Sequence, residues 1–215
     1  MILLFLAWAA QAEPTIVERP LPFTAERFRL SLEYLAEHAD LHPADASIDP
    51  KVVVVHWTAT PSLDASWNTF ESATLAGRSE LQTASALNVS AHFLVDRDGT
   101  IYRLMPDNRM ARHCIGLNHI AIGIENVGGG DAFPLTDAQL SANAALVRYL
   151  AENHEITHVI GHSEYRSFEG HPYFRETDPK YRTTKPDPGP EFMTKLRAQL
   201  TDLHLQGPPT PCCSP

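Results

Sequence analysis

The chain has the size and composition of one globular domain. It contains 215 residues, of which 43% are hydrophobic and 20% are charged, and this mixture excludes an intrinsically disordered chain. The formal net charge is -9 and Lys and Arg residues do not cluster, which argues against a nucleic-acid partner because phosphates require a local stripe of cations. We therefore expect a single compact core that binds no nucleic acid.

The first twelve residues, MILLFLAWAAQA, form an apolar stretch that is too short to span a bilayer. The stretch ends in Ala10-Gln11-Ala12, the small-x-small pattern that signal peptidases cut. We interpret residues 1–12 as a signal peptide and expect a periplasmic or secreted protein without stable membrane insertion. No basic residue precedes the apolar run, so a misassigned start codon or a buried N-terminal strand remains an alternative.

The cysteine count does not predict a disulfide framework. Cys114, Cys212 and Cys213 are an odd number, and the last two are neighbours in a Pro-rich segment, residues 207–215, that we interpret as a flexible tail. A bond between adjacent cysteines would be strained. A bond from Cys114 to the tail is left open, and residues 13–206 are expected to form the domain.

The first elements are a helix and a buried strand. Thr24 can cap a helix that begins at Ala25, carries Phe28, Leu32 and Leu35 on one side, and ends before the Pro43 region. Residues 51–57 form an apolar, β-branched run, which predicts a strand buried on both faces.

A hairpin and another strand are expected next. Residues 90–95 alternate in polarity, an Asp-Arg-Asp-Gly turn follows, and residues 100–105 run back. Residues 120–127 predict a further strand, whose end opens into three glycines that give a substrate close access to the backbone.

The last third of the sequence predicts two helices separated by a short strand. Thr136 and Gln139 form a capping box before a helix with an apolar face, and residues 158–160 form the strand. A final helix is expected after Pro190, with apolar residues at helical spacing: Phe192, Leu196, Leu200 and Leu203. Strands separated by helices predict an α/β fold with one domain, a mixed central β-sheet flanked by helices, and a ligand site at the strand ends.

Residues able to bind a metal follow the ends of these strands. His56 and His162 each follow an apolar strand, and Asp187 lies in a Lys-Pro-Asp-Pro-Gly turn. Two imidazoles and one carboxylate leave a tetrahedral zinc ion one open position, which is typical of zinc hydrolases. Glu125, at the end of another strand, and Lys185, two residues before Asp187, can then act as a base and as a cation that stabilises an oxyanion.

The chain resembles the zinc-dependent N-acetylmuramoyl-L-alanine amidases, a family that includes phage lysozyme-like amidases and peptidoglycan recognition proteins. The motifs that carry the resemblance run in family order from about residue 50 to residue 190: His56-Trp57-Thr58-Ala59, Val89-Ser90-Ala91-His92-Phe93-Leu94-Val95, Ala111-Arg112-His113, Asn118 with Ile122-Gly123-Ile124-Glu125, Gly161-His162-Ser163-Glu164, and Lys185-Pro186-Asp187-Pro188-Gly189. Each motif is modest alone, but together they are specific.

The resemblance implies a role for each site residue. His56, His162 and Asp187 would hold Zn²⁺, Glu125 would be the general base, and Lys185 would stabilise the oxyanion. Residues 13–206 would be the amidase catalytic domain. It would hydrolyse the amide that joins N-acetylmuramic acid to L-alanine in peptidoglycan or its fragments.

The resemblance also implies two substrate contacts. His113 corresponds to a substrate-binding or oxyanion-assisting histidine of the family motif, and Asn118 is expected to touch the substrate. No cofactor other than zinc is implied.

The third metal ligand has rivals in the sequence. The spacing from His162 to Asp187 is longer than in the compact form of the motif, because a polar and aromatic insert occupies residues 164–184. Asp178 precedes a proline as Asp187 does, and Glu164 lies close to His162, so both are alternative ligands. The aromatic residues of the insert predict either a wall of a substrate groove or a loop that packs its own rings.

Two other functions fit the same residues. A non-catalytic module could bind muropeptides without cutting them, and a zinc amidohydrolase could act on another amide, because a metal site specifies hydrolysis and not the acyl group. The sequence does not decide between sacculus and soluble fragments, or between anhydro and hydrated muramic acid.

Overall fold

A mixed six-stranded sheet forms the centre of the molecule in the computed structural model, which describes residues 13–77 and 84–210. The predicted signal peptide, residues 1–12, and the tail residues Cys212 and Cys213 lie outside the described residues. The strands follow the order β1-β4-β3-β5-β2-β6. Their bounds are Ile16–Glu18 for β1, Val52–Trp57 for β2, Phe93–Val95 for β3, Ile101–Arg103 for β4, Ala121–Asn126 for β5 and His158–Gly161 for β6.

Three neighbouring strands, β5, β2 and β6, run parallel and end at the same edge of the sheet. β2 pairs with β5 on one side and with β6 on the other, both in parallel. β3 also runs parallel to β5, and it forms the predicted antiparallel hairpin with β4. The carboxyl ends of β2, β5 and β6 therefore lie side by side, which is where ligands collect in α/β sheets.

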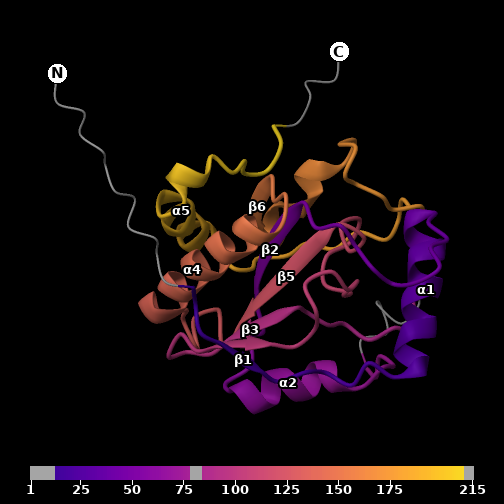
Figure 1. Cartoon of the computed structure of the whole chain (residues 1–215), viewed down its shortest axis with the longest axis horizontal. Coiled ribbons are helices and arrows are strands. Elements are labelled where there is room, and N and C mark those ends of the chain that lie inside the picture. Colours follow the sequence, from indigo (N-terminus) through magenta and orange to yellow (C-terminus); the bar gives the residue numbers. More distant parts are fainter. Residues whose placement is uncertain (1–12, 78–83, 211–215) are drawn as a thin grey trace.

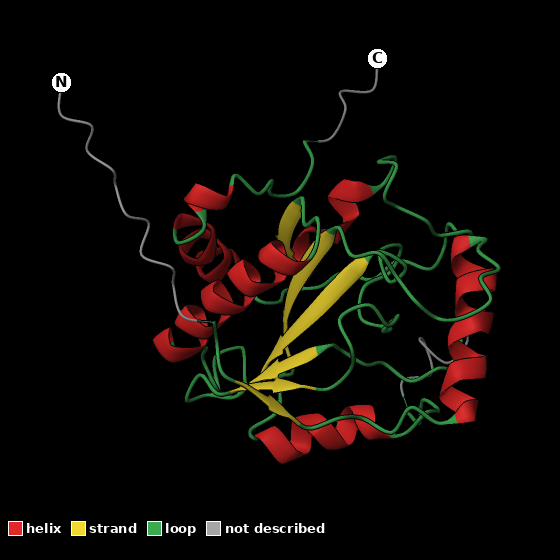
Figure 2. Ribbon diagram, in the orientation of Figure 1, coloured by secondary structure: helices red, strands yellow, loops and turns green. Residues whose placement is uncertain are grey.

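Helices cover both faces of this sheet. In Figures 1 and 2, α4 and α5 lie on one side of the strands and α1 lies on the opposite side. The bounds are Ala25–Ala39 for α1, Leu63–Glu71 for α2, Asp137–Asn153 for α4 and Pro190–Ala198 for α5, with 3₁₀ helices η1 at His162–Phe168 and η2 at Thr201–Leu203. The predicted mixed α/β fold is confirmed.

The alternating side chains of β2 pack against different helices. Val53 and Val55 belong to the core cluster that contains the apolar side chains of α4 and α5. Val52 and Val54 belong to the cluster that contains Leu30 and other residues of α1. Because side chains alternate along a strand, His56 points to the same face as Val52 and Val54. The site residue at the end of β2 is thus on the α1 face.

The caps predicted from the sequence are present. Thr24 accepts a hydrogen bond from the backbone N–H of Arg27 at the start of α1. Thr136 and Gln139 form the reciprocal capping box of α4. The buried face of α1 is rotated from the expected one, since Leu30 and not Phe28 is fully buried.

The final helix is shorter than predicted. α5 ends at Ala198, and the chain continues through the 3₁₀ helix η2, so Leu200 and Leu203 do not belong to one regular helix. The guanidinium of Arg148 on α4 binds the carbonyl of Gln199 and the carboxylate of Asp202, which fixes the backbone at this point. The short strand β1 and the helix α2 were not predicted from the sequence.

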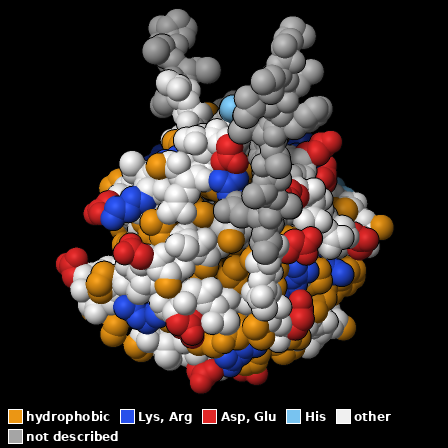
Figure 3. All heavy atoms as spheres, turned by 60° about the vertical axis from the view of Figure 1, so that its left-hand side comes forward, with side chains coloured by type: hydrophobic (Ala, Val, Ile, Leu, Met, Phe, Trp, Pro, Cys, Tyr) orange, Lys and Arg blue, Asp and Glu red, His pale blue; other side chains and the backbone are white. Residues whose placement is uncertain are grey.

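The surface over the α4 and α5 side carries mixed charge. Figure 3 shows Lys and Arg side chains interspersed with Asp and Glu side chains on this face. Within residues 13–77 and 84–210, no helix has both the length and the apolar composition required to cross a bilayer.

Candidate metal centre and active site

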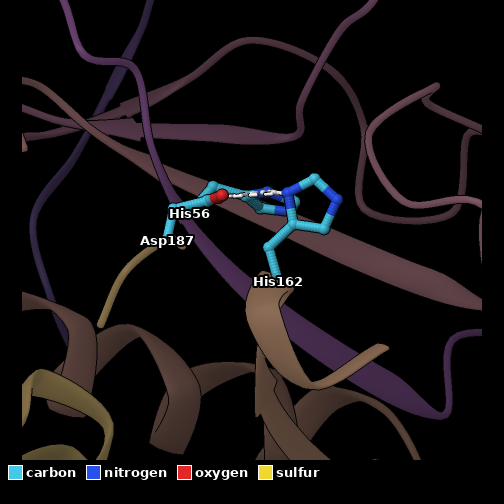
Figure 4. A group of neighbouring side chains, drawn as sticks. All are labelled: His56, His162 and Asp187. Atoms are coloured by element: carbon cyan, nitrogen blue, oxygen red, sulfur yellow. Dashed lines mark hydrogen bonds and ion pairs between the residues drawn. The ribbon is translucent and has the colours of Figure 1, made fainter. Parts of the chain in front are cut away.

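His56, His162 and Asp187 meet at the carboxyl edge of the sheet (Figure 4). The Nδ1 atoms of the two histidines are 2.9 Å apart, and Oδ2 of Asp187 lies 3.0 Å from Nδ1 of His162 and 3.3 Å from Nδ1 of His56. All three residues are buried, and one ligand atom of each lies within 4.8 Å of the others. Three segments distant in sequence thus converge on one point.

The strand register explains why the two histidines meet. Val55 of β2 pairs with Gly161 of β6, so the residues that follow, His56 and His162, are neighbours across adjacent parallel strands. His162 is the first residue of η1, where the chain leaves the sheet. The local sequence therefore places each imidazole at the end of a strand, and the pairing of β2 with β6 brings the two imidazoles together.

The loop that carries Asp187 is fixed against the end of β6. The backbone carbonyl of Asp187 accepts a hydrogen bond of 2.8 Å from the N–H of Ser163. Pro188 packs over Gly161, where an added Cβ would lie 2.8 Å from the proline Cδ. Glycine at position 161 therefore lets the loop approach closely enough for the carboxylate to reach the imidazoles.

The protonation states suit a metal ligand set at neutral pH. Burial, together with the neighbouring His56, lowers the pKa of His162 to about 4, so this imidazole is neutral. Burial alone would raise the pKa of Asp187, but its hydrogen bonds with His162 and His56 outweigh burial and hold the pKa below its ordinary value. A neutral imidazole and an ionised carboxylate are the forms that bind metal ions.

The donor set fits a catalytic zinc ion. Two imidazole nitrogens and one carboxylate oxygen are a common protein ligand set for zinc that leaves one coordination position open. The ligand atoms are close together and buried, and His162 and Asp187 are in the protonation states that zinc requires. The structure does not bring the rival carboxylates into this group.

Both rivals are engaged elsewhere. Glu164 accepts a hydrogen bond of 2.8 Å from the N–H of Gly161 and forms an ion pair with Arg197 of α5. Asp178 is exposed and caps the N–H of Lys180. Of the carboxylates weighed from the sequence, the structure therefore places only Asp187 beside the two imidazoles.

A cavity of about 120 Å³ opens in front of this cluster. Its lining contains the other residues singled out in the sequence, namely Glu125, Lys185, His113 and Asn118. Glu125 is half-buried and is the register partner of His56 on β5. The structure therefore gathers all the predicted site residues in one pocket, while their individual roles stay predictions.

Asn118 lines the pocket, but its side-chain amide forms hydrogen bonds within the protein. Its Oδ1 accepts hydrogen bonds from the N–H groups of His113 and Cys114, at 2.8 and 2.7 Å, and its Nδ2 donates to the Tyr34 hydroxyl at 3.0 Å. These bonds fix the turn that presents His113. The predicted contact between Asn118 and substrate stays a prediction.

Cys114 lies next to this turn and also lines the pocket. Burial, and then the negative charge of Asp187, raise the pKa of its thiol well above the ordinary value. The thiol is therefore protonated at neutral pH and is a weak nucleophile. The bond from Cys114 to the tail that the sequence left open would involve Cys212 or Cys213, which lie outside the described residues.

One wall of the pocket comes from the insert. Tyr181 lines the pocket and its hydroxyl accepts a hydrogen bond of 2.9 Å from Arg112, which also lines it. Tyr165 and Phe168 are instead part of the core under α1. The insert therefore combines both predicted behaviours, and Arg112 and Tyr181 are pocket residues whose importance the sequence alone did not reveal.

Comparison with known proteins places the chain in a family. Residues 46–190, more than half of the chain, match the family described as N-acetylmuramoyl-L-alanine amidase. The chain belongs to the N-acetylmuramoyl-L-alanine amidase family. This confirms the resemblance seen in the sequence motifs.

One curated relative matches part of this chain at low identity. Peptidoglycan recognition protein 3 of Mus musculus is 26% identical over 134 residues, which cover 60% of this chain and 38% of the mouse protein. The matched segment thus spans well under half of that relative's length.

Solved structures share the fold. The N-acetylmuramoyl-L-alanine amidase LysC from Clostridium intestinale has a TM-score of 0.54 at 22% identity, with 90% of this chain and 99% of LysC covered. A selenomethionine derivative of AmpD has a TM-score of 0.52 at 25% identity, with 88% of this chain and 95% of AmpD covered. The N-acetylmuramoyl-L-alanine amidase fold therefore extends over almost the whole chain.

Proposed function

We propose that this protein is a zinc-dependent N-acetylmuramoyl-L-alanine amidase, which hydrolyses the amide between N-acetylmuramic acid and L-alanine in peptidoglycan or its fragments. The observation that carries the proposal is the buried group of His56, His162 and Asp187, which lines the same pocket as Glu125 and Lys185. Membership of the amidase family supports the choice of substrate.

His56, His162 and Asp187 would hold the zinc ion. When bound, zinc supplies a Lewis acid that polarises a carbonyl oxygen and lowers the pKa of water. The buried position of the ligands keeps competing water away from them. The open side of the group faces the pocket, from which a substrate carbonyl would approach.

Glu125 and Lys185 would carry the proton transfers and the charge. Glu125 takes a proton from the attacking water and returns it to the leaving amine, which is the work of a general base that then becomes a general acid. The ammonium of Lys185 stabilises the negative charge that develops on the carbonyl oxygen. Lys185 is half-buried, which strengthens this interaction relative to open water.

The proposed location is outside the cytoplasm, in the periplasm or the medium. The support is the apolar segment 1–12 and its small-x-small end. Peptidoglycan or released muropeptides would be accessible there.

A second candidate is a module that binds muropeptides without cutting them. The match to peptidoglycan recognition protein 3 favours it, because the name of that relative describes recognition. The candidate is the weaker one, since this chain keeps a complete group of metal-binding side chains beside Glu125 and Lys185.

Product analysis on defined muropeptides tests the proposal. Zinc-loaded protein should release peptides with a free L-alanine amino terminus, identified by mass spectrometry, and a strong chelator should abolish the release. Tight binding of intact muropeptide without cleavage would favour the binding module. Cleavage at a different amide would assign another amidohydrolase activity, and cleavage that a chelator leaves unchanged would rule out the zinc-dependent step.

A further inference from the structure

The imidazole of His113 lies between His56 and the start of β5. Its Nδ1 is 3.0 Å from Nε2 of His56, and its Nε2 is 3.2 Å from the carbonyl oxygen of Ala121. The two imidazoles meet edge to face, with centroids 5.1 Å apart and an interplanar angle of 88°. Both nitrogens of His113 are therefore engaged within the protein.

These contacts determine which nitrogen carries each proton. A carbonyl oxygen only accepts hydrogen bonds, so Nε2 of His113 carries the N–H that bonds to Ala121, and Nδ1 of a neutral ring presents a lone pair. His56 must then donate from Nε2 to His113. Nδ1 of His56 is then the ring nitrogen left to bind a metal.

The other ring nitrogen of His56, Nδ1, faces the candidate metal centre. Nδ1 of His56 is the atom that lies 2.9 Å from His162 and 3.3 Å from Asp187. A histidine that binds a metal through one nitrogen commonly donates its other N–H to a neighbouring group, which fixes the tautomer and the ring orientation. His113 occupies the position of that neighbouring group.

The ring of His113 has little freedom to move. Asn118 holds its backbone N–H at 2.8 Å, and the ring packs on Gly123 of β5, where an added Cβ would lie 2.8 Å from the imidazole Cγ. His113 is only 9% exposed. The absence of a side chain at Gly123 therefore creates the space in which the ring sits.

We propose that His113 is a positioning residue, which accepts the Nε2 proton of His56 and thereby holds Nδ1 of His56 toward the metal. The proposal rests on the proposed zinc function of this site. It differs from the substrate contact that the family resemblance implies, because a substrate contact needs a ring nitrogen directed into the pocket. Both nitrogens of His113 instead face His56 and Ala121.

Nuclear magnetic resonance of the wild-type protein tests the tautomer directly. Long-range ¹H–¹⁵N spectra of ¹⁵N-histidine-labelled protein distinguish imidazoles protonated at Nε2 from those protonated at Nδ1, and signals missing from His56→Gln assign His56. We expect His56 of the zinc-loaded protein to carry its proton on Nε2 and to bind the metal through Nδ1. A proton on Nδ1 of His56 in the zinc-loaded protein would overturn the proposal, and this measurement requires no variant at His113.

Zinc affinity tests the consequence without relying on activity. Competition with a chromogenic chelator should show affinity about 10 to 100-fold lower in His113→Phe, which keeps a ring but accepts no hydrogen bond. His113→Asn should recover part of the loss, because its side-chain oxygen can accept the His56 proton. The matched control is His204→Asn, at an exposed position after η2 whose left-handed backbone tolerates asparagine.

The outcomes separate this inference from the proposed function. Wild-type protein that binds no zinc would refute both, whereas equal zinc affinity of wild type and His113→Phe would refute only the role of His113. Muropeptide binding of His113→Phe is measured in parallel in the Glu125→Gln background, at a zinc concentration that saturates both proteins. Weakened muropeptide binding with unchanged zinc affinity would instead assign His113 to the substrate.

Discussion

His56 of β2 and Glu125 of β5 are register partners in adjacent parallel strands. Paired residues of parallel strands project to the same face of a sheet, so the candidate metal ligand and the candidate base line one pocket. The pairing of β2 with β5 therefore sets the position of the candidate base relative to the candidate metal ligand. A loop is needed only to bring the third ligand, Asp187.

The first prediction concerns Asp187 and zinc. Zinc at about 100 times its dissociation constant should stabilise the wild-type protein by about 2.7 kcal/mol, which thermal unfolding measures as a higher midpoint. Asp187→Ala should lose this stabilisation because the ligand group is incomplete. Asp178→Ala is the matched control, since this exposed aspartate lies in the insert and away from the imidazoles. A zinc-dependent shift that survives in Asp187→Ala and disappears in Asp178→Ala would exchange the two assignments.

The second prediction separates chemistry from metal binding. Glu125→Gln should bind zinc with the wild-type stoichiometry but hydrolyse muropeptides about 10² to 10⁴-fold more slowly, because it lacks a general base. Turnover and bound zinc are measured on the same preparation. Glu155→Gln, which removes an exposed carboxylate that pairs with Lys51, should retain full activity. Full activity of Glu125→Gln would contradict the assigned role.

The third prediction concerns the contact that seats the Asp187 loop. Gly161→Ala should destabilise the protein by about 1 to 3 kcal/mol and weaken zinc binding, because the new Cβ meets Pro188 at 2.8 Å and Met193 at 3.0 Å. Chemical unfolding and chelator competition measure the two effects. Gly207→Ala is the control, since its Cβ meets nothing nearer than Arg197 at 3.5 Å. Normal zinc affinity in Gly161→Ala would show that the loop position does not depend on this glycine.

The fourth prediction concerns pH and the insert. His38 at the end of α1 lies 2.9 Å from Glu176 of the insert, whose side chain is fully buried. Burial lowers the pKa of His38, but its bonds with Glu176 and Ala84 outweigh burial and raise the pKa above the ordinary 6.5. The contacts of protonated His38 therefore stabilise the fold fully below pH 6.5. This contribution is lost as the pH rises through the folded-state pKa of His38.

Unfolding of zinc-free protein between pH 6 and pH 8 tests this linkage. His38→Gln should cost about 1 to 3 kcal/mol at pH 6 and should flatten the decrease in stability toward pH 8. His42→Gln, at an exposed histidine just beyond α1, is the control and should keep the wild-type slope. If stability of His38→Gln fell with pH as steeply as that of the wild type, His38 would not be the cause of the pH dependence.

The sequence predicted the parts of the site that depend on local pattern. His56, Glu125 and His162 each follow an apolar run, and such runs become buried parallel strands that end at one edge of a sheet. The helix caps at Thr24 and Thr136 were also readable, because they depend on residues three positions apart. The motifs in family order predicted the amidase family, which the comparison confirmed.

Only the tertiary structure decided which groups meet across long separations. Asp178 and Asp187 offer similar local sequences, and the packing of Pro188 on Gly161 distinguishes them. The link from His113 to His56 likewise depends on strand pairing and on space above Gly123, neither of which has a local signal. Sequence thus determined the chemical groups and the strands that carry them. Long-range packing determined the distances between these groups, and a displacement of a few ångströms is enough to prevent a side chain from binding the metal.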